Sequence, residues 1–128
     1  MIISFVWLIW LALSLSHADI FDDIDVNNNN QTNTGLLYNI IIDNSGENAS
    51  PESIVTIKYT ARLENGIIYQ QFNDPTTVAL DDLPIGWSEA IQLLSQGDVA
   101  RFWIPEDLHY TEQHNQPTGK IILDVELL

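Results

Sequence analysis

Apolar and polar residues alternate strictly between Val55 and Leu63, which is the clearest periodic pattern in the chain. The apolar positions are Val55, Ile57, Tyr59, Ala61 and Leu63, and the positions between them are Thr56, Lys58, Thr60 and Arg62. A period of two predicts a β-strand with one buried face. Asn65-Gly66 follows, a pair that favours the positive φ angles of a two-residue hairpin turn. Residues 67–72 are therefore predicted to form the returning strand.

The rest of the folded part is predicted to hold further short strands and a single helix. The other strands are expected at residues 36–42, 76–80, 99–104 and 120–128. Asn73-Asp74-Pro75 is predicted to end the strand that begins at residue 67. Residues 87–95 are predicted to be helical because Trp87, Ala90, Ile91 and Leu94 share one face, and Gly97 is expected to terminate the helix. The pattern predicts an α+β fold, a twisted antiparallel β-sheet of five to six strands wrapped around one short α-helix.

The N-terminal third is predicted to lie outside this domain. Residues 1–15 are almost wholly apolar and are followed by Ser16-His17-Ala18, a small-x-small pattern suited to signal peptidase. Residues 1–18 are therefore interpreted as a signal peptide and the protein as exported, periplasmic or secreted. No Lys or Arg precedes the apolar run, so an uncleaved membrane anchor stays the alternative. Residues 19–34 are acidic and Asn-rich and are predicted to be a disordered linker, which leaves residues 35–128 as the domain.

Composition narrows the classes of function. Acidic residues outnumber basic ones 18 to 4, which gives a formal charge of −14, so nucleic acid and anionic membranes are excluded as partners. The chain has no cysteine, which excludes disulfides, thiolate metal sites and a cysteine nucleophile. The acidic residues of the linker lack the glycine and the spaced oxygen ligands of a calcium loop, and we expect no metal and no cofactor.

Four separated segments resemble the FKBP family of peptidyl-prolyl cis-trans isomerases. The segments are VTIKYTARLENG at residues 55–66, IGWSEA at 85–90, the stretch from Gly97 through RFWIP at 101–105 to LHY at 108–110, and LDVELL at 123–128. They occur in the family's order over about three quarters of the chain. Residues 34–38, TGLLY, also resemble the strand that opens the macrophage-infectivity-potentiator-like members of the family. The resemblance implies an isomerase that acts on proline-containing polypeptides.

Isomerisation of an X-Pro bond places modest chemical demands on a site. The barrier of roughly 18–20 kcal/mol arises because twisting the amide breaks its resonance, so neither a nucleophile nor a metal is required. A pocket accelerates the twist by fitting the twisted amide better than either planar form. A dry aromatic pocket with a few hydrogen-bond donors is therefore the expected site.

The resemblance also implies roles for individual residues. Trp87 would form the floor beneath the proline ring, Tyr59 and Leu83 would line the walls, and Tyr69 would be a further wall aromatic. Tyr110 would donate its hydroxyl to a substrate carbonyl, and Leu123 occupies a position where the family usually has Phe. From the pattern alone, Trp87 and Tyr59 are also compatible with a purely structural place in the core. His109 and His114, in the same loop as Tyr110, are expected to be ordinary surface residues.

This chain departs from the family within the predicted pocket. Gln70 follows Tyr69 where the family usually has Asp, which removes a charge. Pro84 stands where typical members donate a backbone N–H to the ligand, and proline has none. A second wall aromatic expected near Thr76 is missing, and Leu123 reduces the aromatic area.

Two hypotheses of different class follow from these departures. The first is an isomerase that assists the folding of exported proteins. The alternative is an FKBP-like binding or chaperone module with weak or no isomerase activity. A third hypothesis, an unrelated acidic secreted interaction domain, would require all four matches to be chance. The short Asn-rich linker replaces the long helical segment through which several relatives dimerise, so a monomer is expected.

Overall fold

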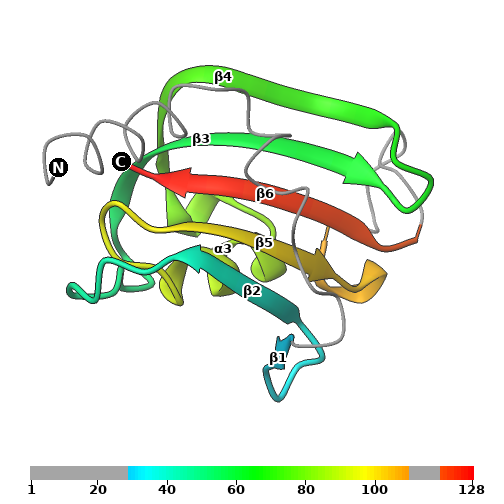
Figure 1. The fold of residues 1–128 in the computed structure, drawn as a ribbon, viewed down its shortest axis with the longest axis horizontal. Helices are drawn as coiled ribbons and strands as arrows, with labels where there is room; N and C mark the ends of the chain where they lie inside the picture. Colours follow the sequence, from blue (N-terminus) through cyan, green and yellow to red (C-terminus); the bar gives the residue numbers. More distant parts are fainter. Residues whose placement is uncertain (1–28, 110–118) are drawn as a thin grey trace, which may run out of the picture.

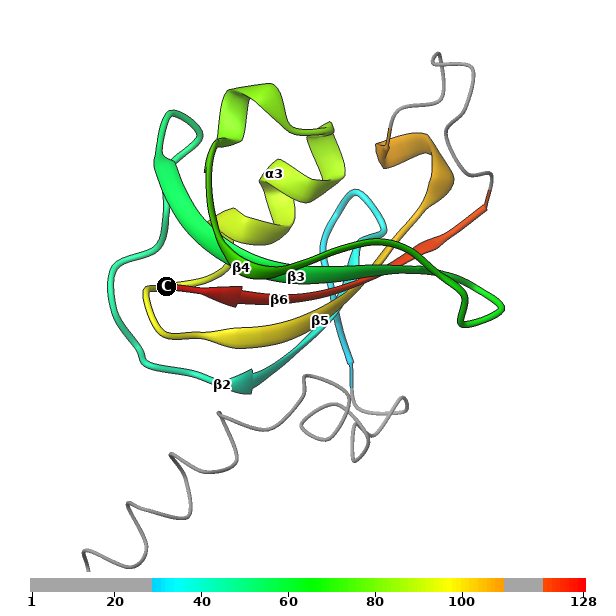
Figure 2. The same ribbon diagram turned by 90° about the horizontal axis from the view of Figure 1, so that it is seen from above.

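A computed structural model describes residues 29–109 and 119–128. Its strands form one antiparallel sheet in the order β1-β2-β5-β6-β3-β4, and α3 lies across one face of it (Figures 1 and 2). The elements are β1 Asn30–Gln31, β2 Leu37–Ile42, β3 Ile54–Leu63, β4 Ile68–Ala79, the 3₁₀ turn η1 Leu80–Asp82, α3 Ile85–Gln92, β5 Val99–Ile104, the 3₁₀ turn η2 Glu106–Leu108 and β6 Ile121–Leu127. The predicted fold class is confirmed. Among the described residues, no helix has the length and apolar character needed to span a membrane.

The core lies between α3 and the sheet. The predicted helix face is buried, since Trp87, Ala90, Ile91 and Leu94 are each at most 5 % exposed. The alternation in β3 turns Ile57, Tyr59 and Ala61 toward the helix, and alternate residues of β5 and β6 complete the floor. This packing places one end of the helix against Tyr59, the one aromatic residue of β3.

An ion cluster occupies the opposite face of the sheet. Asp124 alternates with the core residues Leu123 and Val125 along β6, so its side chain points away from α3. It is nevertheless fully buried, because Arg62 of β3 and Arg101 of β5 both pair with its carboxylate. Arg101 bonds both oxygens, with Nε–Oδ1 at 2.5 Å and an Nη2–Oδ2 distance of 2.9 Å.

The β3–β4 hairpin forms as predicted but closes differently. Gly66 has φ +89°, whereas Asn65 does not have a positive φ. The Gly66 N–H bonds the Leu63 carbonyl, and the Leu63 N–H bonds that of Ile67, which makes the connection longer than a two-residue turn. The predicted pair of positive φ angles is therefore wrong at Asn65, and Gly66 alone supplies the left-handed residue.

The predicted break after Phe72 is also wrong. Strand β4 runs continuously from residue 68 to residue 79, and residues 73–75 form a bulge, since Tyr59 pairs with Phe72 while Ile57 pairs with Thr76. Strand β4 lies at the edge of the sheet, where a proline without an N–H and an irregular register are tolerated.

Two further boundaries differ from the prediction. Helix α3 ends at Gln92, and Gly97, with φ +92°, lies in the turn before β5, where its N–H bonds the Leu127 carbonyl. Gly97 is therefore not the helix terminator. Strand β1 lies inside the segment predicted as disordered linker and pairs with β2. In the same segment, the Thr34 hydroxyl donates a hydrogen bond to Glu89 of α3. That prediction does not hold for residues 29–34, and residues 1–28 lie outside the described ranges.

Candidate functional site

A cavity of about 230 Å³ opens between the start of α3 and the adjoining strands. Its lining comes from β3, β4, η1, α3, the connection between η1 and α3, and the residue after η2. It consists of Tyr59, Tyr69, Gln70, Asp82, Leu83, Pro84, Trp87 and His109. The structure thus brings together six of the eight predicted site residues: Tyr59, Tyr69, Gln70, Leu83, Pro84 and Trp87. Of the other two, Tyr110 lies outside the described residues, and Leu123 does not line the cavity.

Trp87 is both a core residue and a lining residue of the cavity. Its side chain is 5 % exposed and its ring meets that of Tyr59 edge-on, with centroids 5.3 Å apart. Its indole Nε1 is buried and has no hydrogen-bond partner within the described part of the chain. Trp87 therefore belongs to the core and lines the cavity, and its role as the floor beneath a proline ring stays a prediction.

Gly86 explains why the helix can start so close to the sheet. A Cβ at this position would lie 2.7 Å from the Ile104 Cγ2 atom and 2.7 Å from the Leu108 carbonyl oxygen. Contacts this short require the surroundings to shift. The absence of a side chain at residue 86 therefore lets the first turn of α3 approach β5 and η2, which sets the position of Trp87.

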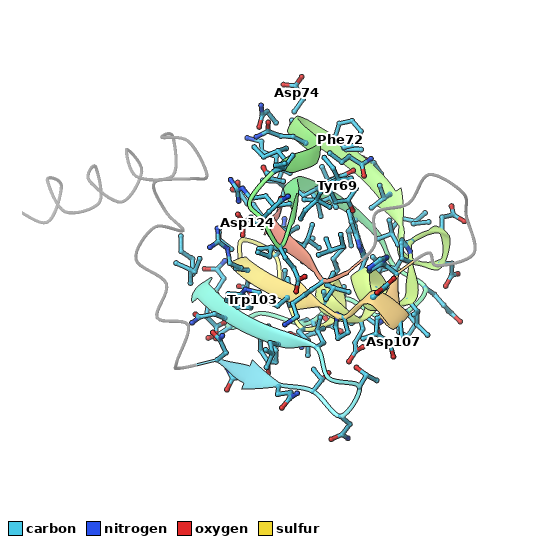
Figure 3. All side chains as sticks on the ribbon, turned by 90° about the vertical axis from the view of Figure 1, so that its right-hand side faces the viewer. Tyr69, Phe72, Asp74, Trp103, Asp107 and Asp124 are labelled. Carbon is cyan, nitrogen blue, oxygen red and sulfur yellow. The ribbon has the colours of Figure 1, made fainter. Side chains whose placement is uncertain are left out.

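Phe72 stands beside the aromatic cavity, outside its lining, and was not predicted. Its ring is 42 % exposed and meets Tyr59 edge-on at 5.1 Å, so Phe72, Tyr59 and Trp87 form a continuous row of rings. Tyr69 and Phe72 both belong to β4 (Figure 3). Phe72 supplies an aromatic ring beside the pocket, although the sequence indicated that a second wall aromatic near Thr76 was missing.

His109 and Asp82 are further lining residues that sequence reasoning missed. The prediction that His109 is an ordinary surface residue is wrong, since it is only 8 % exposed and its Nε2 lies 2.8 Å from the Gly119 carbonyl oxygen. A carbonyl oxygen only accepts, so Nε2 carries the proton. The single turn η2 directs His109 back toward the cavity, and its hydrogen bond to Gly119 joins the two described parts of the chain. Asp82 is exposed at the rim.

Leu123 belongs to the core instead of the cavity wall. It is 1 % exposed and lies between Ala61 of β3 and Phe102 of β5 in the sheet. The prediction that it lines the pocket is therefore wrong for this chain. Leucine is shorter than the phenylalanine that the resemblance led us to expect, and the Leu123 side chain is buried in the core.

Both tyrosines of the cavity are held in their protonated form. Burial, together with the neighbouring Tyr69, raises the pKa of Tyr59 from 10.0 to about 12. Burial also raises the pKa of Tyr69. Each phenol therefore keeps its proton throughout the neutral range and can act as a hydrogen-bond donor.

The raised pKa of Tyr59 predicts a loss of stability at alkaline pH. Between pH 10 and about 12 the unfolded chain releases a proton that the folded chain retains. The stabilisation is complete below pH 10 and is lost as pH rises through about 12. We expect urea-unfolding midpoints to fall over this window and to fall less steeply in Tyr59→Phe. An equally steep fall in that variant would contradict the prediction.

Comparisons with known proteins show which proteins this chain is similar to. The family model described as FKBP-type peptidyl-prolyl cis-trans isomerase matches residues 45–128. A probable FKBP-type peptidyl-prolyl cis-trans isomerase FkpA of Neisseria meningitidis is 34 % identical over 104 residues, covering 76 % of this chain and 38 % of the relative. A macrophage infectivity potentiator of Trypanosoma cruzi is 32 % identical over 103 residues, covering 74 % of this chain and 53 % of the relative. The chain thus spans between about two fifths and half of the length of these relatives.

Solved structures with the same fold include two bacterial proteins. FkpA from Escherichia coli superposes with a TM-score of 0.72 at 25 % identity, over 78 % of this chain and 50 % of that one. A peptidyl-prolyl cis-trans isomerase from Pseudomonas syringae has a TM-score of 0.74 at 24 % identity and covers 85 % of each chain. At that identity the second similarity establishes the fold alone.

Proposed function

The chain belongs to the FKBP-type peptidyl-prolyl cis-trans isomerase family, and from that premise we propose that its aromatic cavity catalyses cis–trans isomerisation of X-Pro bonds in polypeptides. One observation carries the proposal. Tyr59, Tyr69 and Trp87 come from three separate elements and converge on a single cavity of about 230 Å³. Residues with purely structural roles would not be expected to line the same cavity.

The chemistry follows from the lining. A proline ring seated on Trp87 leaves its amide in an apolar environment, where the twisted form loses less solvation than the planar form. The protonated phenols of Tyr59 and Tyr69 are available to hold the carbonyls on either side of the bond. The buried Nε1 of Trp87 offers a further donor. All of these interactions orient the substrate, and none requires a covalent step.

A protease-coupled assay with proline-containing peptides tests the proposal. The purified protein is expected to shorten the slow phase of cleavage, which reports cis-to-trans conversion of the X-Pro bond. The acceleration should be proportional to protein concentration. A slow phase equal to the uncatalysed background at every protein concentration would refute isomerase activity.

The binding-module hypothesis stays a second candidate because of Gln70 and Pro84, both of which line the cavity. Restoring the usual family residues with Gln70→Asp and Pro84→Ile adds a carboxylate and a backbone N–H. Each hydrogen bond gained contributes roughly 0.5–1.5 kcal/mol, so we expect kcat/KM to rise by about tenfold. Pro84 has an extended backbone at the N-cap of α3, with φ −52° and ψ 148°, which isoleucine also adopts.

Gln71→Asp provides the matched control for this double variant. Gln71 is the next residue of β4, and its side chain bonds Thr60 on the face away from the cavity. The substitution therefore adds the same negative charge outside the site. This control should leave kcat/KM unchanged. No gain in the double variant would count against the idea that these two residues weaken the site.

The setting of the enzyme is also part of the proposal. The chain is exported, residues 1–18 are removed as a signal peptide ahead of Asp19, and the mature protein acts as a monomer on proline-containing polypeptides. The apolar run and the Ser16-His17-Ala18 pattern support cleavage at this point. The mass of the mature protein and its sedimentation behaviour test the two statements separately.

A further inference from the structure

The face of the sheet opposite α3, which we call the outer face, collects most of the positive charge of the chain (Figure 2). Lys58 and Arg62 of β3 and Arg101 of β5 alternate with core residues along their strands and therefore point away from α3. They are three of the four basic residues in the sequence. Strand β6 adds two carboxylates to the same face, those of Asp124 and Glu126. Strands β3, β5 and β6 thus give this face a net charge of +1, from three positive and two negative groups, in a chain of net charge −14.

The buried carboxylate does not neutralise this face. Asp124 has one negative charge and pairs with the guanidinium groups of Arg62 and Arg101, so the cluster keeps a net charge of +1. Glu126 lies opposite Lys58 in the register of β3 and β6, so these two charges balance. Arginine is not deprotonated in proteins, so the charge of the cluster is permanent. The centre of the outer face therefore favours an acidic ligand.

An apolar row crosses the outer face beside these charges. Leu37 of β2 is paired with Trp103 of β5, which is paired with Ile122 of β6, and all three are half-buried. The row ends at Arg62 of β3, which lies opposite Ile122. Residues opposite each other in a sheet are close enough to share a ligand. A segment that covers this surface therefore needs apolar and acidic side chains together.

The described part of the chain begins at this face. The Asn39 side chain donates to the Oδ1 atom of Asn29 at 3.4 Å, and Asn39 is paired with Arg101 across β2 and β5. Residues 19–28 therefore join the described chain close to the arginine cluster. Ten extended residues reach at most about 33–36 Å, since each spans about 3.3–3.6 Å. The distance from β2 across β5 and β6 to β3 is about 14 Å at the usual strand spacing, so the segment is long enough to cross the face.

Residues 19–28 combine acidic and apolar side chains and contain no basic residue. The segment reads Asp19-Ile20-Phe21-Asp22-Asp23-Ile24-Asp25-Val26-Asn27-Asn28. It has too few large apolar residues to fold alone, so it needs a partner surface to become ordered. Because it is attached beside the outer face, its effective concentration there is on the order of millimolar, and weak contacts are sufficient.

We propose that residues 19–28 dock on the outer face of the sheet. Their carboxylates lie beside Lys58, Arg62 and Arg101, and their apolar side chains cover Trp103 and Ile122. The docked segment compensates the charge of the arginine cluster and shields the apolar row from water. The aromatic cavity lies on the α3 side of the sheet, so the proposal does not rest on isomerase activity.

A paramagnetic label tests the docking. Because the chain has no cysteine, Ile20→Cys gives the mature protein a single attachment point for a nitroxide group. The label is expected to broaden the amide signals of Trp103 and Ile122 in the sheet more than those of Ala90 and Ile91 in α3. Signals of the outer strands that are not broadened, or equal broadening of the sheet and α3, would overturn the proposal.

Removing the carboxylates of the segment tests the role of charge. Asp22→Asn, Asp23→Asn and Asp25→Asn in the labelled protein remove three negative charges from the segment. Three weak surface ion pairs together change an equilibrium at least about threefold, so the ratio of docked to undocked segment should fall by at least that factor. Unchanged broadening in this variant would contradict the assignment of the carboxylates to the outer face.

Two controls make the result specific. Asp81→Asn, Glu106→Gln and Asp107→Asn remove the same number of charges at exposed positions of η1 and η2 and should leave the broadening unchanged. A loss as large as that in the segment variant would mean that net charge, not contact, controls the docking. Labelled protein mixed with unlabelled, isotope-enriched protein should not broaden the signals of the enriched chain. Broadening in the mixture would mean that the outer face binds the segment of a second copy, which would overturn docking within one chain.

Discussion

Replacing Trp87 by leucine is expected to lower kcat/KM for X-Pro isomerisation by roughly ten- to a hundredfold. Contact with a fully buried apolar side chain is worth about 1.5–3 kcal/mol, and about 1.4 kcal/mol corresponds to a factor of ten in rate. Leucine keeps an apolar residue on the face of α3 but removes the ring that meets Tyr59 at 5.3 Å and the buried Nε1. Trp87→Phe keeps a ring without the N–H, so its difference from the parent reports the contribution of the donor, and its difference from Trp87→Leu reports that of the ring.

Ile91→Val is the matched control for this prediction. Ile91 is fully buried on the same helix but does not line the cavity, so its truncation should cost roughly 0.5–1.5 kcal/mol of stability with little change in kcat/KM. Urea unfolding of each variant shows whether it is folded at the assay temperature. A folded Trp87→Leu protein with the rate of the parent would mean that Trp87 is a core residue only.

The fold could be predicted because its strongest signals are local. The period of two in β3 and the shared face of α3 each state which side chains face the core, and these faces can be buried only against each other. The order of the strands in the sheet was not accessible in this way. Pairing of β2 with β5 joins residues about sixty positions apart, and nothing in a local pattern specifies it.

The site was predicted where a short motif fixes the geometry and missed where tertiary pairing decides it. Gly86-Trp87 identified the start of α3 because only a residue without a side chain fits beside Leu108. Phe72 was missed because Asn73-Asp74-Pro75 has the composition of a turn, yet an edge strand accommodates it as a bulge. His109 was missed because its sequence neighbours are polar and predict a surface loop, whereas the short turn η2 directs its side chain inward.

Gln70 and Pro84 alter the cavity without altering the fold. Gln70 is exposed at the cavity, and Pro84 precedes α3 without distorting it, since the Ser88 N–H still bonds the Pro84 carbonyl at 3.0 Å. Neither substitution therefore disturbs the fold. Their effect is confined to the groups that the cavity offers to a ligand, so binding and catalysis can be changed at these positions without loss of stability.

Removing the carboxylate of Asp124 is expected to have the largest effect on stability. Asp124 is fully buried between Arg62 and Arg101, and taking one partner from a buried ion pair costs roughly 3–5 kcal/mol. The two arginine side chains are about a fifth exposed, at 18 % and 21 %, and can partly turn to solvent. We therefore expect about 3 kcal/mol for Asp124→Ala, measured from urea unfolding, which is a large part of the stability of a small domain.

Two comparisons identify the cause of that loss. Asp81→Ala removes an exposed carboxylate and should change stability by no more than about 0.5 kcal/mol. A triple variant with Arg62→Met, Arg101→Met and Asp124→Leu replaces the whole cluster by apolar groups and should recover most of the stability, because no charge is left buried without a partner. If Asp124→Ala lost less than about 1 kcal/mol, solvent rather than the two arginines would be satisfying this carboxylate. If the triple variant were as unstable as the single one, lost packing rather than unpaired charge would be the cause, and the sheet would depend on the shape of the cluster.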